Sequence, residues 1–190
     1  MRVRQRKVLP ELETDHLLFR NFRSSDLEEL YRLLSNRSVM QYDGTPLIKN
    51  RYEAEYYLKN LLNQGNSSGD SSIRWAAEEK RSRALIGTIG FQLWDQNNHH
   101  AELGGNMIPA RWGKGFSREA LSVILPFGFQ SMRLNRVSAV VRTTNRPALA
   151  VLNKLKFKRE GILRDYHHVN GRYEDAYLYS LLKKDYFKKG

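Results

Sequence analysis

The sequence predicts an α+β domain in which helices flank a mixed, mostly antiparallel central sheet. Three apolar segments separated by short polar turns predict an antiparallel meander, and they span residues 73–79, 85–94 and 101–108. Two segments with apolar residues at helical spacing precede this meander, at residues 25–34 and 50–63. A chain of 190 residues has the size of one domain and can bury a sizeable core.

The remaining elements continue this mixed order. Apolar residues predict a first strand at 16–22, and Ser25 with Glu28 three residues later predicts a capping box at the start of the first helix. After the meander we expect a helix, a strand, a short helix starting at Pro147 and two final strands. Apart from the short helix, these span residues 117–132, 136–142, 157–163 and 175–182.

Two segments and one turn complete the predicted organisation. Asn170-Gly171 predicts a hairpin turn before the last strand. Residues 64–72 contain only small and polar side chains, which predicts a mobile loop within the domain. We therefore expect residues 1–190 to form a single domain with a basic leader at residues 1–14.

Composition excludes several classes of site. The chain has no cysteine, which excludes disulfides, thiolate metal sites and a cysteine nucleophile. A formal net charge of +12 favours polyanionic partners such as RNA or an acidic protein surface, although solvated termini are an alternative explanation. The basic clusters are Arg2, Arg4, Arg6 and Lys7 at one end, and Lys183, Lys184, Lys188 and Lys189 at the other. With no membrane-spanning run or secretory signal, we expect a cytoplasmic protein without membrane contact.

The segment from Pro109 to Ala120 predicts a phosphate-binding turn. An alternating apolar strand leads into it, and a helical pattern leads out. Gly113 and Gly115 permit a tight turn, and the unpaired N–H groups at the start of a helix attract phosphate. The spacing does not fit a Walker loop, and Arg118 stands where a dinucleotide fingerprint needs its third glycine. An ordinary glycine turn is the alternative.

This segment resembles the acyl-CoA loop of the GCN5-related N-acetyltransferases, the GNAT superfamily. Residues 112–117, Trp-Gly-Lys-Gly-Phe-Ser, keep the central glycine of the pattern Gln/Arg-x-x-Gly-x-Gly/Ala, but depart from it at Trp112 and Ser117. The sequence Pro-x-x-Trp-Gly-Lys-Gly-Phe followed by Glu-Ala is similar to the Rim-type branch, which acetylates ribosomal proteins. The order of predicted elements matches this fold over nearly the whole chain.

The resemblance implies that acetyl-CoA binds along the turn and the strand before it. The residues expected at the phosphates are Gly113, Lys114, Gly115, Phe116, Ser117 and Arg118. Gly104-Gly105 predicts a bulge or a close backbone approach, and in this family a bulge separates two strands to admit the pantetheine arm. Backbone N–H groups of Asn106, Met107 and Ile108 would then bind the arm and the thioester oxygen. No metal is implied.

Glu102 is the residue that the resemblance implies as the base. It lies in the strand before the turn, in Ala-Glu-Leu-Gly, where the Rim-type branch has a glutamate that takes the proton of the acceptor amine. The alternative is an exposed strand residue that pairs with Arg142 or another cation. His99 and His100 have ordinary pKa values closer to neutrality, but a predicted turn makes them solvated residues.

Asn145 and Asn153 lie in a second segment that is similar to the family. Asn145, Ala148, Leu152 and Phe157 match Asn-x-x-Ala-x-x-x-Leu-Tyr-x-x-Gly-Phe. Asn145 could be a helix N-cap, and the family implies a hydrogen bond from it to the pantetheine arm. Asn153 replaces a tyrosine that protonates the leaving thiolate, so it could only bind the sulfur or hold a water. Lys156 replaces the usual glycine.

We therefore expect an acetyl-CoA-dependent N-acetyltransferase that works through a ternary complex. The expected acceptor is a protein N-terminal amine, and a ribosomal protein is the candidate that the resemblance implies. The positive charge weakly disfavours a polyamine. The predicted helices at 25–34 and 50–63 would border the acceptor groove. Alternatives are a small-molecule acceptor such as an aminoglycoside or amino acid, a non-catalytic CoA-binding module that docks RNA, and a nucleotide-binding protein. The sequence leaves a homodimer open.

Overall fold

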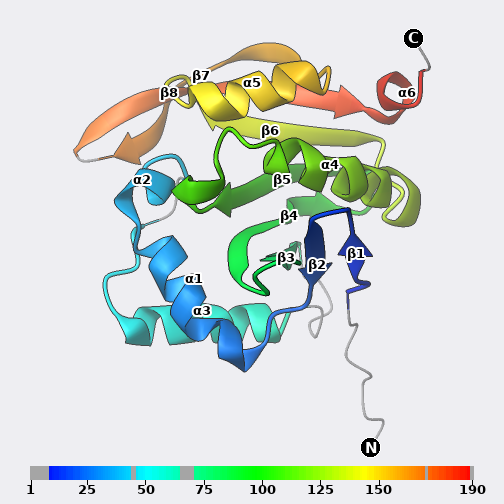
Figure 1. Cartoon of the computed structure of the whole chain (residues 1–190). Helices are drawn as coiled ribbons and strands as arrows, with labels where there is room; N and C mark the ends of the chain where they lie inside the picture. The colour runs from blue at the N-terminus through cyan, green and yellow to red at the C-terminus, as the bar shows by residue number, and fades with distance from the viewer. Residues whose placement is uncertain (1–8, 44–45, 65–70, 170, 189–190) are drawn as a thin grey trace, which may run out of the picture.

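The computed structural model describes residues 9–43, 46–64, 71–169 and 171–188, and Figure 1 shows how they are arranged. Within these residues, eight strands form one sheet in the order β1-β2-β3-β4-β5-β6-β8-β7. The strands are β1 (Leu12–Glu13), β2 (Leu17–Arg20), β3 (Ile73–Glu79), β4 (Leu85–Asp95), β5 (His100–Met107), β6 (Arg136–Arg142), β7 (Lys158–Val169) and β8 (Arg172–Leu182). Neighbouring strands are antiparallel except β5 and β6, which are parallel. This confirms the mixed, mostly antiparallel sheet.

Helices cover both faces of this sheet. They are α1 (Leu27–Leu34), α2 (Arg37–Met40), α3 (Arg51–Leu62), α4 (Phe116–Pro126), α5 (Arg146–Lys154) and α6 (Lys183–Tyr186). Helices α4 and α5 pack on one face, where a larger core contains Trp75, Ile124 and Leu152. Helices α1 and α3 lie side by side on the other face, where a second core contains Leu58 and Ala76. Trp75 and Ala76 enter different cores because side chains alternate across a strand.

Local signals in the sequence predicted most elements correctly. Helix α3 begins after Asn50, whose side chain accepts a hydrogen bond from the Glu53 N–H at 3.0 Å. Strand β6 has the predicted bounds, and Val169 pairs with Arg172 across the predicted hairpin turn. Parts of three predicted segments lie outside the described residues. These are residues 1–8 of the leader, residues 65–70 of the loop and Asn170 of the turn.

The start of the first helix differs from the prediction. The expected capping box of Ser25 and Glu28 is wrong, because a 3-10 turn precedes α1 and the Asp26 carboxylate accepts a hydrogen bond from the Arg23 N–H at 2.7 Å. Part of the expected leader is also structured. Leu12–Glu13 pair with β2, so that the sheet begins earlier than the sequence pattern indicates.

The parallel pairing of β5 with β6 stops after three residue pairs, of which Glu102 with Ser138 is the last. Beyond that pair β5 continues to Met107 and β6 continues to Arg142. We call this feature the β5–β6 divergence. It leaves the backbone edges of both strands that face each other without a strand partner over these residues.

The two glycines in β5 do not form the expected bulge. Gly104 and Gly105 pair with β4 in regular register, and the irregularity in this pair lies instead beside Leu93, which has a φ of 50°. A Cβ on Gly105 would lie 2.7 Å from the carbonyl oxygen of Thr88. Gly105 therefore permits a close approach of β4, which was the other possibility that glycine in a strand indicates.

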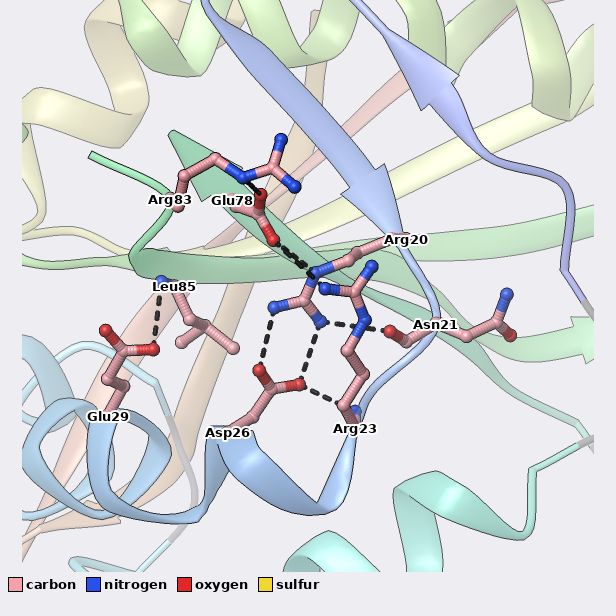
Figure 2. Close-up of polar contacts among 8 residues, drawn as sticks. All are labelled: Arg20, Asn21, Arg23, Asp26, Glu29, Glu78, Arg83 and Leu85. Carbon is pink, nitrogen blue, oxygen red and sulfur yellow. Dashed lines mark hydrogen bonds and ion pairs between the residues drawn. The ribbon is translucent and has the colours of Figure 1, made fainter. Parts of the chain in front are cut away.

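A buried ion-pair network joins β2, β3 and the turn before α1. Figure 2 shows Arg20 between two carboxylates. Its Nε donates to Glu78 at 2.6 Å, and its Nη1 and Nη2 donate to the two oxygens of Asp26 at 2.9 and 2.7 Å. The three side chains are 3 % exposed or less. Burial acts to lower the pKa of Arg20, but the bonds to Asp26 and Glu78 outweigh it, so that the pKa is raised overall.

A second ion pair ties the segment after β5 to the end of β3. Arg111 donates from Nε and Nη2 to the two oxygens of Glu79, at 2.9 and 2.8 Å. Ser82 adds a hydroxyl hydrogen bond to the same carboxylate at 2.6 Å. The hydrogen bond from Arg111 is the main cause that lowers the pKa of Glu79, to about 2. The beginning of the glycine turn is thus fixed to the sheet.

The Arg20 network generates a prediction about stability. R20M keeps an unbranched apolar stem but removes the buried cation that Asp26 and Glu78 share, so we expect the unfolding free energy to fall by about 3–5 kcal/mol. R83M removes an arginine that also contacts Glu78 but is 71 % exposed, and its cost should stay below about 1 kcal/mol. Urea unfolding measures both. A loss below about 1 kcal/mol for R20M would contradict a stabilising role.

The Glu79 ion pair generates a prediction about acid stability. The folded-state pKa of about 2 lies below the unfolded value of about 4.3, so the contribution of Glu79 is complete above about pH 4.3 and is lost as the pH falls toward 2. E79Q should therefore show a weaker fall in stability between about pH 5 and pH 2 than the wild type. The exposed carboxylate variant E55Q serves as the control, and equal pH slopes for all three proteins would refute the linkage.

Candidate active site

The glycine turn connects β5 with α4. Gly113 and Gly115 have φ values of 70° and 87°, and nothing lies within 4 Å of a Cβ built on either, so conformation and not space requires glycine. Gly115 is the N-cap of α4, so the first N–H groups of that helix face the turn. The exposed side chains here are those of Lys114, Ser117 and Arg118, while Phe116 packs against the larger core. Helix N–H groups beside two cations suit a phosphate.

The end of β5 presents backbone groups to the β5–β6 divergence. The N–H of Ile108 donates to the carbonyl of Ile86 on β4 at 2.8 Å, so it is already occupied. Because N–H groups alternate sides along a strand, the N–H of Asn106 also faces β4, and that of Met107 faces β6. The Trp112 indole donates to the Met107 carbonyl at 2.7 Å and so covers this end of the divergence. Met107 is therefore the backbone donor of the three that a ligand there could reach.

Glu102 lies where the divergence begins, on the face of the sheet shared with α1 and α3. Its carboxylate accepts a hydrogen bond from Gln92 Nε2 at 2.7 Å. The Gln92 Oε1 accepts in turn from Arg74 at 3.3 Å. Arg142, the partner that the sequence suggested, binds Glu174 instead. Glu102 is thus held by a neutral amide. This hydrogen bond brings no cation into contact with the Glu102 carboxylate.

A second hydrogen-bonded chain runs on the same face toward α2. Arg74 donates to the Thr88 hydroxyl at 3.1 Å, and that hydroxyl lies 3.1 Å from Asn106 Oδ1. Asn106 Nδ2 then donates to Asp43 at 2.8 Å. The side chain of Asn106, predicted only for its backbone, therefore links the sheet with the segment that follows α2.

Asn145 and Asn153 lie at opposite ends of α5. Asn145 is the N-cap of this helix, and its Oδ1 accepts from the Ala148 N–H at 3.2 Å. Its Nδ2 remains the part of the side chain that can donate to a ligand. Asn153 is exposed near the C-terminal end of α5. Lys156 just beyond has a φ of 63°, a conformation that glycine accommodates most readily.

The β7–β8 hairpin approaches the same site from the other side of β6 and extends toward α2 (Figure 1). Arg142 on β6 binds Glu174 on β8 through Nε and Nη2, and its Nη1 donates to the Gln41 carbonyl after α2. His167 on β7 lies opposite Glu174. Burial lowers the pKa of His167 and Arg142 lowers it further, while Glu174 and Glu102 act in the opposite direction. The lowered pKa favours the neutral form of the His167 imidazole, which lies within electrostatic reach of Glu102.

Three polar residues of this site were not predicted from the sequence: Arg74, Gln92 and His167. Each is a single polar residue within a strand pattern, which by itself indicates a solvated face. His99 and His100, which were considered, lie at the β4–β5 turn, where His100 pairs with Asp95 at 3.8 Å. The signal that could have found Arg74 is its register opposite two glycines, and that register becomes visible only once the strands are paired.

The described part of the chain contains neither a metal-binding cluster nor a membrane-spanning helix. No group of three or more histidine and acidic side chains is placed there to hold a metal ion. None of the helices described is both long and apolar enough to cross a membrane.

The chain is similar to known acetyltransferases. Residues 16–158 match the family model described as the acetyltransferase (GNAT) domain. Over 176 residues it is 34% identical to the uncharacterized N-acetyltransferase YoaA of Bacillus subtilis, covering 93% of this chain and 98% of that protein. 

Two solved structures share the fold. One is a spermidine N-acetyltransferase from Vibrio cholerae in complex with CoA and spermine, with a TM-score of 0.80 and 23% identity over 92% of this chain and 100% of that chain. The other is the ribosomal-protein-S5-alanine acetyltransferase from Vibrio fischeri, with a TM-score of 0.79 and 22% identity over 93% of this chain and 98% of that chain. The resemblance seen in the glycine turn is confirmed: the chain belongs to the GNAT family and is an N-acetyltransferase whose acetyl donor is acetyl-CoA.

Proposed function

We propose that the acceptor is the primary amine at the start of a polypeptide, and that Glu102 takes its proton. The observation that carries this proposal is the environment of Glu102, which accepts a hydrogen bond from neutral Gln92 at the start of the β5–β6 divergence. An α-amino group has an ordinary pKa near 8, so a single carboxylate is a sufficient base for it. A lysine amine, with an ordinary pKa near 10.4, needs a stronger base.

The charges around Glu102 favour an acceptor with one positive charge. Two arginines, Arg74 and Arg142, have their side chains on the same face of the sheet as Glu102, and Glu174 is already bound to Arg142. A polyamine carries several positive charges and would meet these cations, within a chain of net charge +12. The same net charge suits an acceptor that is bound to RNA, such as a ribosomal protein. Of the two solved neighbours, the V. fischeri protein is a ribosomal-protein-S5-alanine acetyltransferase and the V. cholerae protein is a spermidine N-acetyltransferase.

The chain's own residues account for the steps of direct transfer. Acetyl-CoA supplies the acetyl thioester. Glu102 accepts one proton of the ammonium group, directly or through water, and the neutral nitrogen bonds to the acetyl carbon. As the carbon–sulfur bond breaks, the nitrogen releases its second proton to solvent, which leaves a neutral amide. The N–H of Met107 can stabilise the negative charge that grows on the thioester oxygen. The leaving thiolate takes a proton from solvent, because Asn153 is an exposed amide and not an acid.

The remaining residues predicted from the sequence take binding roles in this proposal. The turn from Gly113 to Arg118 holds the phosphates at the start of α4, with Phe116 as its anchor in the core. Asn145 donates from Nδ2 to the pantetheine arm while its Oδ1 caps α5. Asn106 and Ile108, on either side of Met107, bind β4 through the Thr88 hydroxyl and the Ile86 carbonyl, and so hold this end of β5 in place.

The role of Glu102 is tested by E102Q, which keeps the size of the side chain and removes the base. We expect kcat/KM for the amine acceptor to fall by about 10²- to 10⁴-fold, while the Kd for acetyl-CoA, measured by calorimetry, stays within twofold. E11Q removes an exposed carboxylate before β1 and should leave both values unchanged. Full activity of E102Q would refute Glu102 as the base, and wild-type protein that binds acetyl-CoA without turnover would favour a non-catalytic module.

The acceptor class is tested by direct competition. At equal concentrations, an alanine-initiated peptide with a free N-terminus should be acetylated at least about tenfold faster than spermidine, because spermidine meets the arginines beside Glu102. The same peptide with a blocked N-terminus and an internal lysine is the control and should not react. A preference for spermidine, or for an aminoglycoside or free amino acid, would replace the proposed acceptor with a small-molecule amine. Mass spectrometry of the peptide identifies the modified nitrogen.

A further inference from the structure

The Arg74 side chain extends along one face of the sheet, over a row of glycines. In the paired strands, Arg74 on β3 lies opposite Gly90 on β4, and Gly90 lies opposite Gly104 on β5. Residues that are paired across strands point to the same face, so this row belongs to the face that carries Glu102. Two positions beside Arg74 in the row have no side chain, which leaves a path over β4 toward β5.

The two glycines leave this path for different reasons. A Cβ on Gly90 would lie 2.0 Å from the Ile73 carbonyl oxygen, so the close approach of β3 requires glycine there. A Cβ on Gly104 would meet the Nη2 of Arg74 at 3.3 Å, together with Gln92 Oε1 at 3.4 Å. Gly104 is therefore the position over which the guanidinium lies, and its lack of a side chain lets Arg74 reach Gln92.

The guanidinium sets the direction of both hydrogen-bonded chains. Arginine has donors and no acceptor, so the Gln92 oxygen must turn toward Arg74 and the Gln92 NH₂ group must turn toward Glu102. The Thr88 hydroxyl also accepts from Arg74, so its single proton is directed to Asn106 Oδ1. Each chain starts at a group that only donates and ends at a carboxylate that, when ionised, only accepts.

We propose that Arg74 is a positioning residue for acetyl transfer, which holds the Glu102 carboxylate in place by fixing the orientation of the Gln92 amide. This inference rests on the proposed role of Glu102 as the base. Without Arg74 the amide can rotate by half a turn and present its oxygen to Glu102, which would push the carboxylate away. Arg74 acts through Gln92 and makes no contact with the reacting atoms.

Double-mutant kinetics test the inference. R74M keeps most of the bulk of the side chain and removes every donor. With acetyl-CoA saturating and an alanine-initiated peptide as acceptor, we expect kcat to fall by about 10- to 100-fold, while the Kd for acetyl-CoA and the urea midpoint change little. R74K keeps the charge and a donor and should recover part of kcat. R133M removes an exposed arginine of the turn before β6 and is the matched control, which should match the wild type.

Non-additivity separates positioning from a general structural effect. In the E102Q background, R74M should cause less than about a twofold further loss, because the proposed effect of Arg74 on acetyl transfer is exerted through that carboxylate. G104A keeps all donors and an ordinary backbone conformation but crowds the guanidinium, and it should lower kcat in the same direction by a smaller factor. This variant also keeps the test decisive if R74M does not fold.

The outcomes distinguish the two proposals. If E102Q retains activity, the proposed base is wrong whatever Arg74 does. If E102Q is inactive but R74M and G104A keep the wild-type kcat, the base stands and the positioning role of Arg74 is refuted. An equal loss from R74M in the wild-type and E102Q backgrounds would also refute it, since the effect would then be independent of Glu102.

Discussion

The β5–β6 divergence is the constraint on which the site depends. In a parallel pair, each strand uses its backbone groups on its neighbour, and here that pairing ends at Glu102 and Ser138. Beyond this point the inner edges of both strands have no strand partner, although the Trp112 indole binds the Met107 carbonyl. The groups that we propose for the chemistry and for phosphate binding lie along those edges: Glu102 where the divergence begins, Met107 on the β5 edge, and the glycine turn and α4 immediately after it. The sheet thus provides backbone donors in its middle, where a regular sheet would have none to spare.

The two faces of the sheet contribute different chemistry to this position. On the α4 and α5 face the side chains are apolar, and the helix start and glycine turn provide the groups that attract phosphate. On the α1 and α3 face the apolar core is smaller, and polar residues of β3, β4 and β5 continue past it. A donor bound from the first face and an acceptor from the second would meet at the divergence. The Arg20 network matters here because it fixes α1 to β2 and β3, and so fixes the helix beside the acceptor face.

Most of the fold and the donor half of the site could be predicted from the sequence, because their signals are local. Gly113 and Gly115 with the helix after them lie within a few residues, and so do Asn50 and Asn145 with the helices that they cap. The capping box at Ser25 failed because Asp26 is held by Arg20, which lies in another element. On the acceptor side Glu102 was predicted, but Arg74 and Gln92 were missed for the same reason. They lie on two other strands, and a one-residue change of register would turn either of them to the opposite face.

The contacts of Arg142 support our proposal that acceptor specificity is set on the α1 and α3 face of the sheet. It belongs to β6, but its guanidinium joins the β7–β8 hairpin through Glu174 to the segment after α2 through the Gln41 carbonyl. The Tyr42 ring, 5.9 Å from the Arg142 guanidinium carbon, extends the contact. The donor side is fixed by backbone geometry, which tolerates little change, whereas this junction is made of side chains on three separate elements. Substitutions there can move His167 and the hairpin relative to Glu102 without disturbing the divergence, so relatives with one donor can differ in their acceptor.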